Sequence, residues 1–414
     1  MAISSGENQA AMQDPKPEGF DSRLVFRDGP RVAPRPDVPK MKSEPGFEYA
    51  EHGFIGDTIT LTLPNGQSSV AVKYPFKLPN GLSVTYGQIN GLAGDFYGTT
   101  KPISDGTSPK DQGTRFQAAY ETLALNKASR QPAEAQSILV ILQKEVAAIN
   151  EALKKGIDPS SVYAKLDDET WSLQDKTLRR PSDQPTYIGL AKINWDHFGA
   201  DARTAYNAGH TMALQQAIQG SDPQNLFTAY TMNAFADHFL QDSFSAGHLR
   251  TPRRQLHSTS GDADLCAKYM HDEDNAIGLS VQNPRQETWQ MYGDKRLLDT
   301  VDVTNQVLVT KAIQASANEI FQAWSTKQMP TPDIYQAWQY APTLDSARAV
   351  DQKLVRLFTF ESQPQRRAVI ADRCQSKFTL DYWYSTTALD CRTSGLWNYP
   401  ITLNCASTNG QPEI

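Results

Sequence analysis

The chain has 414 residues, a formal net charge of −6, 39% hydrophobic residues and 9% aromatic residues. This composition is sufficient for a globular core and excludes a chain that is disordered throughout. The acidic balance offers no electrostatic footprint for nucleic acid, and no apolar run is long enough to form a membrane-spanning helix.

The first 50 residues are predicted to form an extended N-terminal arm. Prolines recur among charged residues from Pro15 to Pro45, a composition that is typical of extended segments. The first 25 residues contain no apolar stretch of the kind found in a standard secretory signal peptide. We therefore expect a cytoplasmic protein, or one exported by a non-standard route.

A small β-ribbon is predicted near residues 55–80. The runs DTITLTLPNG and SSVAVKYPFKLPNG alternate apolar and polar residues and end in Pro-Asn-Gly turns, as two short strands do. The Gly-rich segment that follows, GLSVTYGQINGLAGDFYG, surrounds a short helical stretch and places Asp95 in a turn.

The middle of the chain is predicted to be helical, which makes the fold class mainly α. Apolar residues recur at helical spacing, and most of these stripes are expected to be core. The predicted helices are Arg115–Lys127, a helix opened by Pro132 and ended by Gly156, Ala202–Ile218, Asn225–Asp242, Ala263–Ile277 and Thr304–Trp324.

Residues 51–330 are thus expected to form the helical core, and residues 331–414 an irregular C-terminal extension or cap. In the extension, Pro332–Tyr340 and Leu344–Leu357 can be helical, whereas Lys377–Thr402 is expected to be partly β or irregular. The four cysteines lack CxxC spacing, which argues against a thiolate zinc site. Three of them lie in the last 41 residues and allow one disulfide there.

Six of the seven histidines fall between His197 and His271. Within this window His238 and Asp242 are four residues apart, so on a helix both side chains lie on one face. His248 follows after Ser-Ala-Gly, a flexible stretch that can turn the chain back. A lone pair of this kind is more often a hydrogen-bonded surface pair, but the concentration of histidines favours a metal site.

Two ligand sets can be drawn from these residues. The first consists of His197, His238 and Asp242, and the second of His248, His271 and Asp274. Three protein ligands leave a fourth position of a zinc ion open for water, as in catalytic zinc sites. Two such ions about 3.5–4 Å apart would clamp a phosphoryl group and supply hydroxide near neutral pH.

The motifs TYGQINGLAGDFYG, NWDHF, AYNAGH, HFLQDSFSAGH, MHDEDN and WQMYGD together resemble the zinc-dependent phospholipase C and P1 nuclease superfamily. The resemblance is greatest to the larger bacterial and fungal phosphatidylcholine-preferring phospholipases C, and it covers roughly Leu82–Leu298. It implies a multi-helix zinc phospholipase C-like core with two zinc ions and room for a third. It also implies that His197, His238, Asp242, His248 and His271 are metal ligands.

The chain departs from the superfamily at two positions. The acid expected four residues after His271 is Asn275, so the last ligand is open between Asp274, which we choose, Asp272 and Asn275. The superfamily holds its third ion partly through an N-terminal Trp, which does not stand at a recognisable start here. Asp95 and Asp183 are the candidate substitutes, although a turn-stabilising Asx motif and a helix N-cap would explain them equally.

The resemblance implies hydrolysis of phosphatidylcholine-type lipids to diacylglycerol and phosphocholine by metal-activated water, with Asp95 and Asp242 as the catalytic carboxylates. The expected partner is a phospholipid at a membrane surface or in a micelle, and nucleic acid is not favoured. Two alternatives stay open: a P1-like single-strand nuclease, and a non-enzymatic, metal-stabilised interaction protein. The roles of His210 and of the C-terminal extension are also open, and His52 is given no role.

Overall fold

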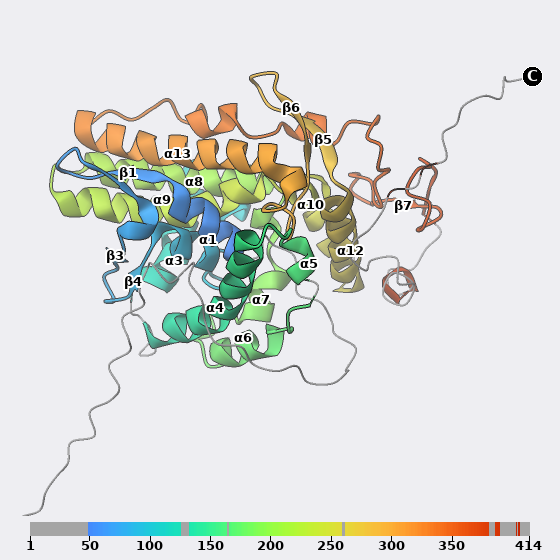
Figure 1. Ribbon diagram of the computed structural model, residues 1–414, viewed down its shortest axis with the longest axis horizontal. Coiled ribbons are helices and arrows are strands. Elements are labelled where there is room, and N and C mark those ends of the chain that lie inside the picture. Colours follow the sequence, from blue (N-terminus) through green and yellow to red (C-terminus); the bar gives the residue numbers. More distant parts are fainter. Residues whose placement is uncertain are drawn as a thin grey trace, which may run out of the picture.

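The computed structural model describes residues 49–125, 132–163, 165–258, 261–380, 386–389, 403 and 405. In these residues the protein is mainly helical, as predicted, and its strands form four short antiparallel pairs (Figure 1). The predicted N-terminal arm lies almost entirely outside the described residues. None of the described helices has the length and apolar character needed to cross a membrane.

Three long helices form the centre of the molecule. The helices α8 (Gly199–Ile218), α9 (Pro223–Asp242) and α13 (Val303–Thr326) pack against one another (Figure 1). Every residue of α9 from Ala229 to Asp242 is buried. A helix that is surrounded on all sides needs partners for each of its polar side chains. The functional groups of α9 are therefore held by neighbouring elements.

The predicted β-ribbon near residues 55–80 is wrong at its start, because the chain is helical at residues 49–58. Residues 55–58 belong to the helix α1 (Tyr49–Thr58), which packs against α2 (Tyr86–Leu92). A Cβ atom at Gly56 would clash with Asn90 Oδ1 and would lie 2.6 Å from the Cα atom of Gly87. The glycines that weaken the helical signal of this sequence are thus the residues that let α1 and α2 approach closely.

The strands form two separate hairpins in place of one ribbon. The strand β1 (Thr60–Thr62) pairs with β2 (Ser68–Val70), and β3 (Phe76–Lys77) pairs with β4 (Ser83–Val84). The helix α2 follows directly and begins with a capping box, in which the Thr85 side chain accepts from the Gln88 N–H and the Gln88 side chain accepts from the Thr85 N–H.

The other predicted helices are present, with shifted ends, as α3 (Pro109–Ala124), α4 (Ala133–Lys154) and α12 (Gly261–Ile277). Ser108 caps α3 and Asp222 caps α9, each followed by proline at the first helical position. Short elements were not predicted: α5 (Ser160–Tyr163), α6 (Thr170–Thr177), α7 (Tyr187–Lys192), α10 (Ala246–Arg250), α11 (Arg253–His257), and the strand pair β5 (Leu279–Gln282) with β6 (Thr288–Met291).

The C-terminal segment is less helical than predicted. The range Leu344–Leu357 contains only α14 (Leu344–Ala347), and Pro332–Tyr340 contains a 3-10 turn at Gln336–Gln339. The strands β7 (Arg366–Arg367) and β8 (Phe378–Thr379) form a short pair, and much of Lys377–Thr402 lies outside the described residues. A disulfide joins Cys374 to Cys405.

A buried ion pair attaches this segment to α12. Glu273 accepts two hydrogen bonds of 2.9 Å from the Arg367 guanidinium and one of 2.5 Å from Arg373. The side chains of Glu273 and Arg367 are at most 1% exposed.

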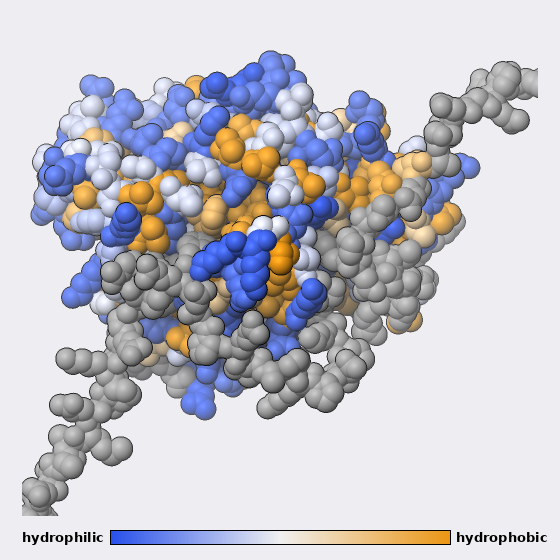
Figure 2. All heavy atoms as spheres, in the orientation of Figure 1, coloured by the Kyte–Doolittle hydropathy of each residue, from blue (hydrophilic) through white to orange (hydrophobic). Residues whose placement is uncertain are grey.

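On the face shown in Figure 2, apolar side chains gather in several patches between polar ones.

Candidate metal centre

Eight histidine and aspartate side chains from separate parts of the chain gather in three neighbouring groups that could each hold a metal ion, two of which share His238. Within each group the ligand atoms lie within 4.8 Å of one another. The groups are His52, His238 and Asp242; Asp95, His197 and His238; and His248, His271 and Asp294. All except Asp95 are buried, with at most 4% of the residue exposed.

The C-terminal end of α9 provides the centre of this arrangement. His238 and Asp242 lie one turn apart on the helix, as predicted, with 3.5 Å between His238 Nε2 and Asp242 Oδ2. The chain then turns at Ser245, and α10 brings His248 back so that its Nδ1 atom lies 3.0 Å from Asp242 Oδ1. The expected return of a second imidazole is therefore present.

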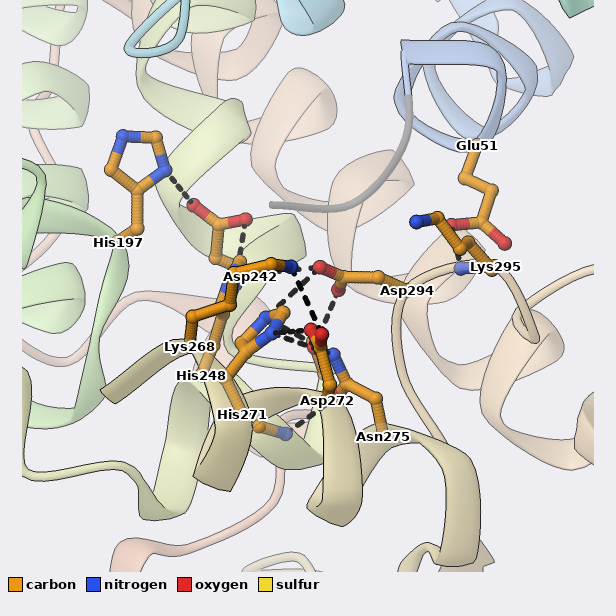
Figure 3. A network of polar contacts seen from close by, with 12 residues as sticks. Glu51, His197, Asp242, His248, Lys268, His271, Asp272, Asn275, Asp294 and Lys295 are labelled. Carbon is orange, nitrogen blue, oxygen red and sulfur yellow. Dashed lines mark hydrogen bonds and ion pairs between the residues drawn. The ribbon is translucent and has the colours of Figure 1, made fainter. Parts of the chain in front are cut away.

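Asp242 faces imidazoles on both of its oxygens. His197 Nδ1 lies 2.9 Å from Oδ2, and His52 Nε2 lies 3.8 Å from Oδ1 on the other side (His197 is shown in Figure 3). Two ligands of one tetrahedral zinc ion, each at about 2.1 Å, stand about 3.4 Å apart. The distance from Asp242 to His197 is shorter than this value, and the distance from Asp242 to His52 is longer. The three side chains therefore fit ligands of metal ions that share Asp242.

Contacts on the far side of the imidazole rings direct their Nε2 atoms towards the centre. Histidines that bind metals usually donate their other ring N–H to a carbonyl or carboxylate. Three rings follow this pattern: His238 Nδ1 lies 2.8 Å from the Asn90 carbonyl, His52 Nδ1 lies 2.5 Å from Gln241 Oε1, and His271 Nδ1 lies 3.1 Å from Asp272 Oδ1. This support was not foreseen from the sequence.

The structure corrects the carboxylate of the second ligand set. Asp294 Oδ2 lies 3.0 Å from His271 Nε2 and 3.9 Å from His248 Nε2 (Figure 3). The predicted ligand Asp274 is instead bound by Arg250, which donates through Nε at 2.9 Å and also through Nη2. Because that carboxylate is engaged in a buried ion pair, Asp274 is not part of the centre, and Asp294 takes its place.

The other two residues considered for this position support the centre from outside. Asp272 pairs with Lys268 at 2.9 Å in addition to its contact with His271. Asn275 Oδ1 accepts from the Gly247 N–H at 2.6 Å and from the Ser245 hydroxyl at 2.9 Å. Asn275 thus holds the start of α10, the helix that carries His248.

The loop that carries Asp294 is attached to both neighbouring elements. The Ser245 hydroxyl lies 2.8 Å from Asp294 Oδ1 and shares its single proton between this carboxylate and Asn275 Oδ1. The Glu51 carboxylate on α1 accepts from the backbone N–H groups of Lys295 at 2.9 Å and of Leu297 at 3.1 Å. The same helix, α1, also carries His52. It therefore provides one candidate ligand and holds the loop that carries another, Asp294.

The turn after α2 brings Asp95 to the centre, beside His197 and His238. The preceding Gly94 has a positive φ of 67°, and a Cβ atom there would lie 2.7 Å from His197 Cε1 and 2.8 Å from His238 Nε2. Only glycine leaves room for both rings. Asp183, the other candidate for a third site, is exposed and belongs to none of the three groups.

The charges of the centre shift the pKa values of its members. Burial alone would lower the pKa of His197, but the adjacent Asp242 carboxylate raises it to about 9. Asp294 has the same effect on His271 and raises its pKa, against burial, to about 9. Burial lowers the pKa of His238 well below its usual value, so this ring is neutral and able to coordinate a metal.

The structure gives places to His52 and to His210, whose role the sequence leaves open. His52, to which the sequence analysis gives no role, completes the group of His238 and Asp242. His210 lies away from the three groups, between α9 and α13, with Nδ1 2.6 Å from Asn233 Oδ1 and Nε2 3.2 Å from Glu319 Oε2. It stabilises the helix packing.

A pocket lies against the outer side of His197. Its lining is largely apolar and includes Gly94, Tyr97, Ile103, Leu190, Ile193, Phe235 and Phe239, together with Lys101 and Asn194. Asp196 also lines the pocket, whose free volume of about 30 Å³ has room for only a few water molecules. The pocket therefore places apolar surface next to His197.

Comparison of the chain with protein-family models, with curated proteins and with solved structures finds no match in any of the three. The resemblance to zinc-dependent phospholipases C therefore stays a prediction from the motifs. The geometry itself establishes buried His/Asp groups that are positioned to hold metal ions.

Proposed function

We propose that the protein is a metal-dependent phosphodiester hydrolase, and that it acts as a phospholipase C on phosphatidylcholine-type lipids. The observation that supports this most is the set of three neighbouring ligand groups: two of them share His238, and His248 of the third lies 3.0 Å from Asp242 of the first. Neighbouring ion sites of this kind are typical of enzymes that clamp a phosphoryl group. The lipid products would be diacylglycerol and phosphocholine.

Zinc is the metal that this ligand chemistry favours. The described groups offer imidazole nitrogens and carboxylate oxygens and no thiolate, which is the usual donor set of catalytic zinc sites. We propose His52, His238 and Asp242 for one ion, His248, His271 and Asp294 for a second, and Asp95 with His197 for a third. When bound, such ions polarise a phosphoryl group and activate water for attack.

The chain's own residues supply orientation and proton transfer. The neighbouring imidazoles hold the pKa of Asp242 well below its usual range against the effect of burial, so its carboxylate stays ionised between the groups. Asp95 is less buried than the other members and follows Gly94 at the edge of the pocket. We propose that Asp95 accepts the proton of the attacking water, as a general base.

The surroundings of the centre support a lipid substrate over a single-stranded nucleic acid. A nuclease of this type needs an exposed aromatic ring on which a base can stack. Phe96, Tyr97 and Phe244 are at most 4% exposed, and Phe96 is stacked on Tyr187. Trp195 is half-buried, and its ring contacts the His257 ring and the Arg254 guanidinium. The pocket beside His197 adds apolar surface next to the centre, although Lys101 and Asp196 also line it.

Turnover by the zinc-loaded protein tests this proposal. We expect phosphocholine release from phosphatidylcholine micelles by the wild type and its loss in Asp242→Asn. Asp237→Asn is the matched control, because Asp237 lies on the same helix, is equally buried and accepts hydrogen bonds from Tyr86 and Ser316 outside the three groups. Its turnover should persist as long as thermal unfolding shows a folded protein.

Unchanged lipid turnover in Asp242→Asn would contradict the proposal, as would a zinc-loaded wild type that hydrolyses neither lipid nor single-stranded DNA. Cleavage of single-stranded DNA without lipid turnover would replace the lipid by a nucleic acid as the substrate.

A further inference from the structure

Two arginines approach the same aromatic ring outside the metal centre. The guanidinium carbons of Arg348 and Arg356 lie 4.5 Å and 4.8 Å from the centre of the Phe360 ring. Arg356 also donates a 3.2 Å hydrogen bond to the backbone carbonyl of Arg348. The ring and this bond hold two positive charges close together, which costs free energy unless an anion compensates them.

In the described part of the chain, neither arginine forms an ion pair with a carboxylate within 4.0 Å. The charges of the exposed residues Asp345 and Glu361 raise the pKa of Arg348 and of Arg356, respectively, but neither carboxylate forms an ion pair with them. The other two acidic groups nearby are bound by other arginines. Both oxygens of Asp201 accept from Arg254, at 3.0 Å and 2.9 Å. Asp274 is bound by Arg250. Among the described residues, the neighbouring arginines Arg250 and Arg254 therefore have ion-pair partners, whereas this pair has none within 4.0 Å.

Burial and the charge of a neighbouring arginine lower the pKa of each guanidinium. Burial and the charge of Arg356 lower the pKa of Arg348, while burial and the charge of Arg250 lower the pKa of Arg356. The Nε atom of Arg348 is buried and donates no hydrogen bond to any described residue. A buried donor without an acceptor is costly, so the arrangement favours an acceptor from outside the chain.

The pair lies beside the first residue of α8. A Cβ atom at Gly199 would stand 2.8 Å from Arg348 Nη2, and the φ of 53° at Gly199 also suits glycine. The absence of a side chain lets the guanidinium approach the backbone at the positive end of a 20-residue helix. This helix end adds to the positive potential of the arginine pair.

We propose that Arg348 and Arg356 form a binding site for a phosphate group with two negative charges, either as free phosphate or as the phosphomonoester headgroup of a lipid. Guanidinium forks match phosphate oxygens, and a dianion neutralises both cations where a carboxylate would neutralise one. Neither arginine belongs to the three metal groups. The proposal therefore does not depend on the proposed hydrolase activity.

Calorimetric titration of the full chain with inorganic phosphate tests the site. We expect binding by the wild type that weakens about tenfold or more in Arg348→Gln and in Arg356→Gln, the effect of losing a charge-assisted hydrogen bond. The same titrations in an Asp242→Asn background separate this site from phosphate bound at the metal centre. There the dependence on both arginines should persist.

Arg203→Gln is the matched control. Arg203 lies on α8 and also stacks over an aromatic ring, that of Trp338, at 4.2 Å, but no second arginine of the described residues shares that ring. Its phosphate affinity should equal that of the wild type. Equal affinity in Arg348→Gln, Arg356→Gln and the wild type would overturn the proposal, as would an equal loss in Arg203→Gln.

Thermal unfolding distinguishes ligand binding from a structural role of the arginines. Phosphate should raise the Tm of the wild type, and this increase should vanish in both glutamine variants. A purely structural role would lower the Tm by the same amount with and without phosphate and would overturn the proposal.

Co-sedimentation with phosphatidylcholine vesicles that contain phosphatidic acid identifies the source of the phosphate. Arginine-dependent binding to these vesicles indicates a lipid headgroup, whereas binding of phosphate without vesicle binding indicates the free anion. A wild type that binds neither would contradict the site.

Discussion

Asp242 is the residue at which the parts of the candidate centre meet. His197 lies 2.9 Å from one of its oxygens and His248 lies 3.0 Å from the other. Among the described residues, no other carboxylate forms a candidate metal group with histidines of both α9 and α1. A single aspartate thus connects ligands that are far apart in the chain, and its loss should affect more than one ion.

Substitution of the second-site carboxylate tests the corrected ligand set. Asp294→Asn should lose one equivalent of zinc, because Asp294 faces His271 and His248. Asp274→Asn should keep its zinc but lose about 3–5 kcal/mol of unfolding free energy, since it leaves the Arg250 guanidinium buried without its charge partner. Metal analysis and urea unfolding of both variants measure these effects, and the reverse pattern would restore Asp274 as the ligand.

Gly94→Ala should disturb the centre without changing a ligand. The new Cβ atom would lie 2.7 Å from His197 and 2.8 Å from His238, and a displacement of about 1 Å at a catalytic group can cost about 100-fold in rate. Gly66→Ala is the control, because Gly66 also has a positive φ, 76°, but no atom within 4 Å of the new Cβ. Equal turnover in the two variants would contradict the proposed effect of the contact with the rings.

Metal affinity should depend on pH through His197 and His271. Without metal both rings have a pKa raised to about 9, so they are protonated at neutral pH and contribute stability that is complete below about 6.5 and is lost as the pH rises through about 9. Metal binding must displace these protons. The zinc affinity should therefore rise with pH up to about 9, by about tenfold per pH unit for each proton released. Competition with a chromophoric chelator at several pH values measures this slope, and a flat profile would contradict the site.

At the scale of the elements, the sequence predicts the helices that carry strong periodicity but not the packing that completes the centre. His238, Asp242, His248 and His271 lie on or between long predicted helices, so local spacing is enough to group them. His52 and Asp294 reach the centre only through tertiary contacts. The packing of α1 on α2 depends on glycines, which weaken rather than strengthen a helical pattern.

The motif WQMYGD contained a signal for Asp294 that local reasoning did not use. Asp294 follows a glycine in a turn, as Asp95 does in GDFYG. The choice of Asp274 rested on helical spacing from His271. Spacing places a residue on a face of α12 but does not show that Arg250 occupies that face.

Gly56→Ala tests the close contact between α1 and α2. The added Cβ atom would collide with Asn90 and the backbone of Gly87, and overpacking of this kind costs about 1–3 kcal/mol. Since the Asn90 carbonyl accepts from His238, zinc affinity should fall as well. Gly53→Ala on the same helix meets no atom within 4 Å and should be neutral or stabilising. Urea unfolding compares the two, and equal stability would contradict the proposed role of the contact.

At the scale of the molecule, the mainly helical class follows from periodicity and composition. The long helices α8, α9 and α13 form a rigid centre, and the residues with chemistry lie at the end of its most buried helix. Burial explains why the site is so difficult to derive from one sequence. Eight side chains from elements spread over about 240 residues, from His52 to Asp294, are brought together only by the complete fold.

The central claim is that this buried cluster holds metal ions, and the metal content of the purified full-length protein tests it most directly. Elemental analysis after zinc loading and removal of free metal should find two to three zinc equivalents per chain in the wild type, a clear loss in Asp242→Asn and an unchanged content in the control Asp237→Asn. Less than one equivalent in a folded wild-type protein, or the same content in Asp242→Asn, would contradict the account.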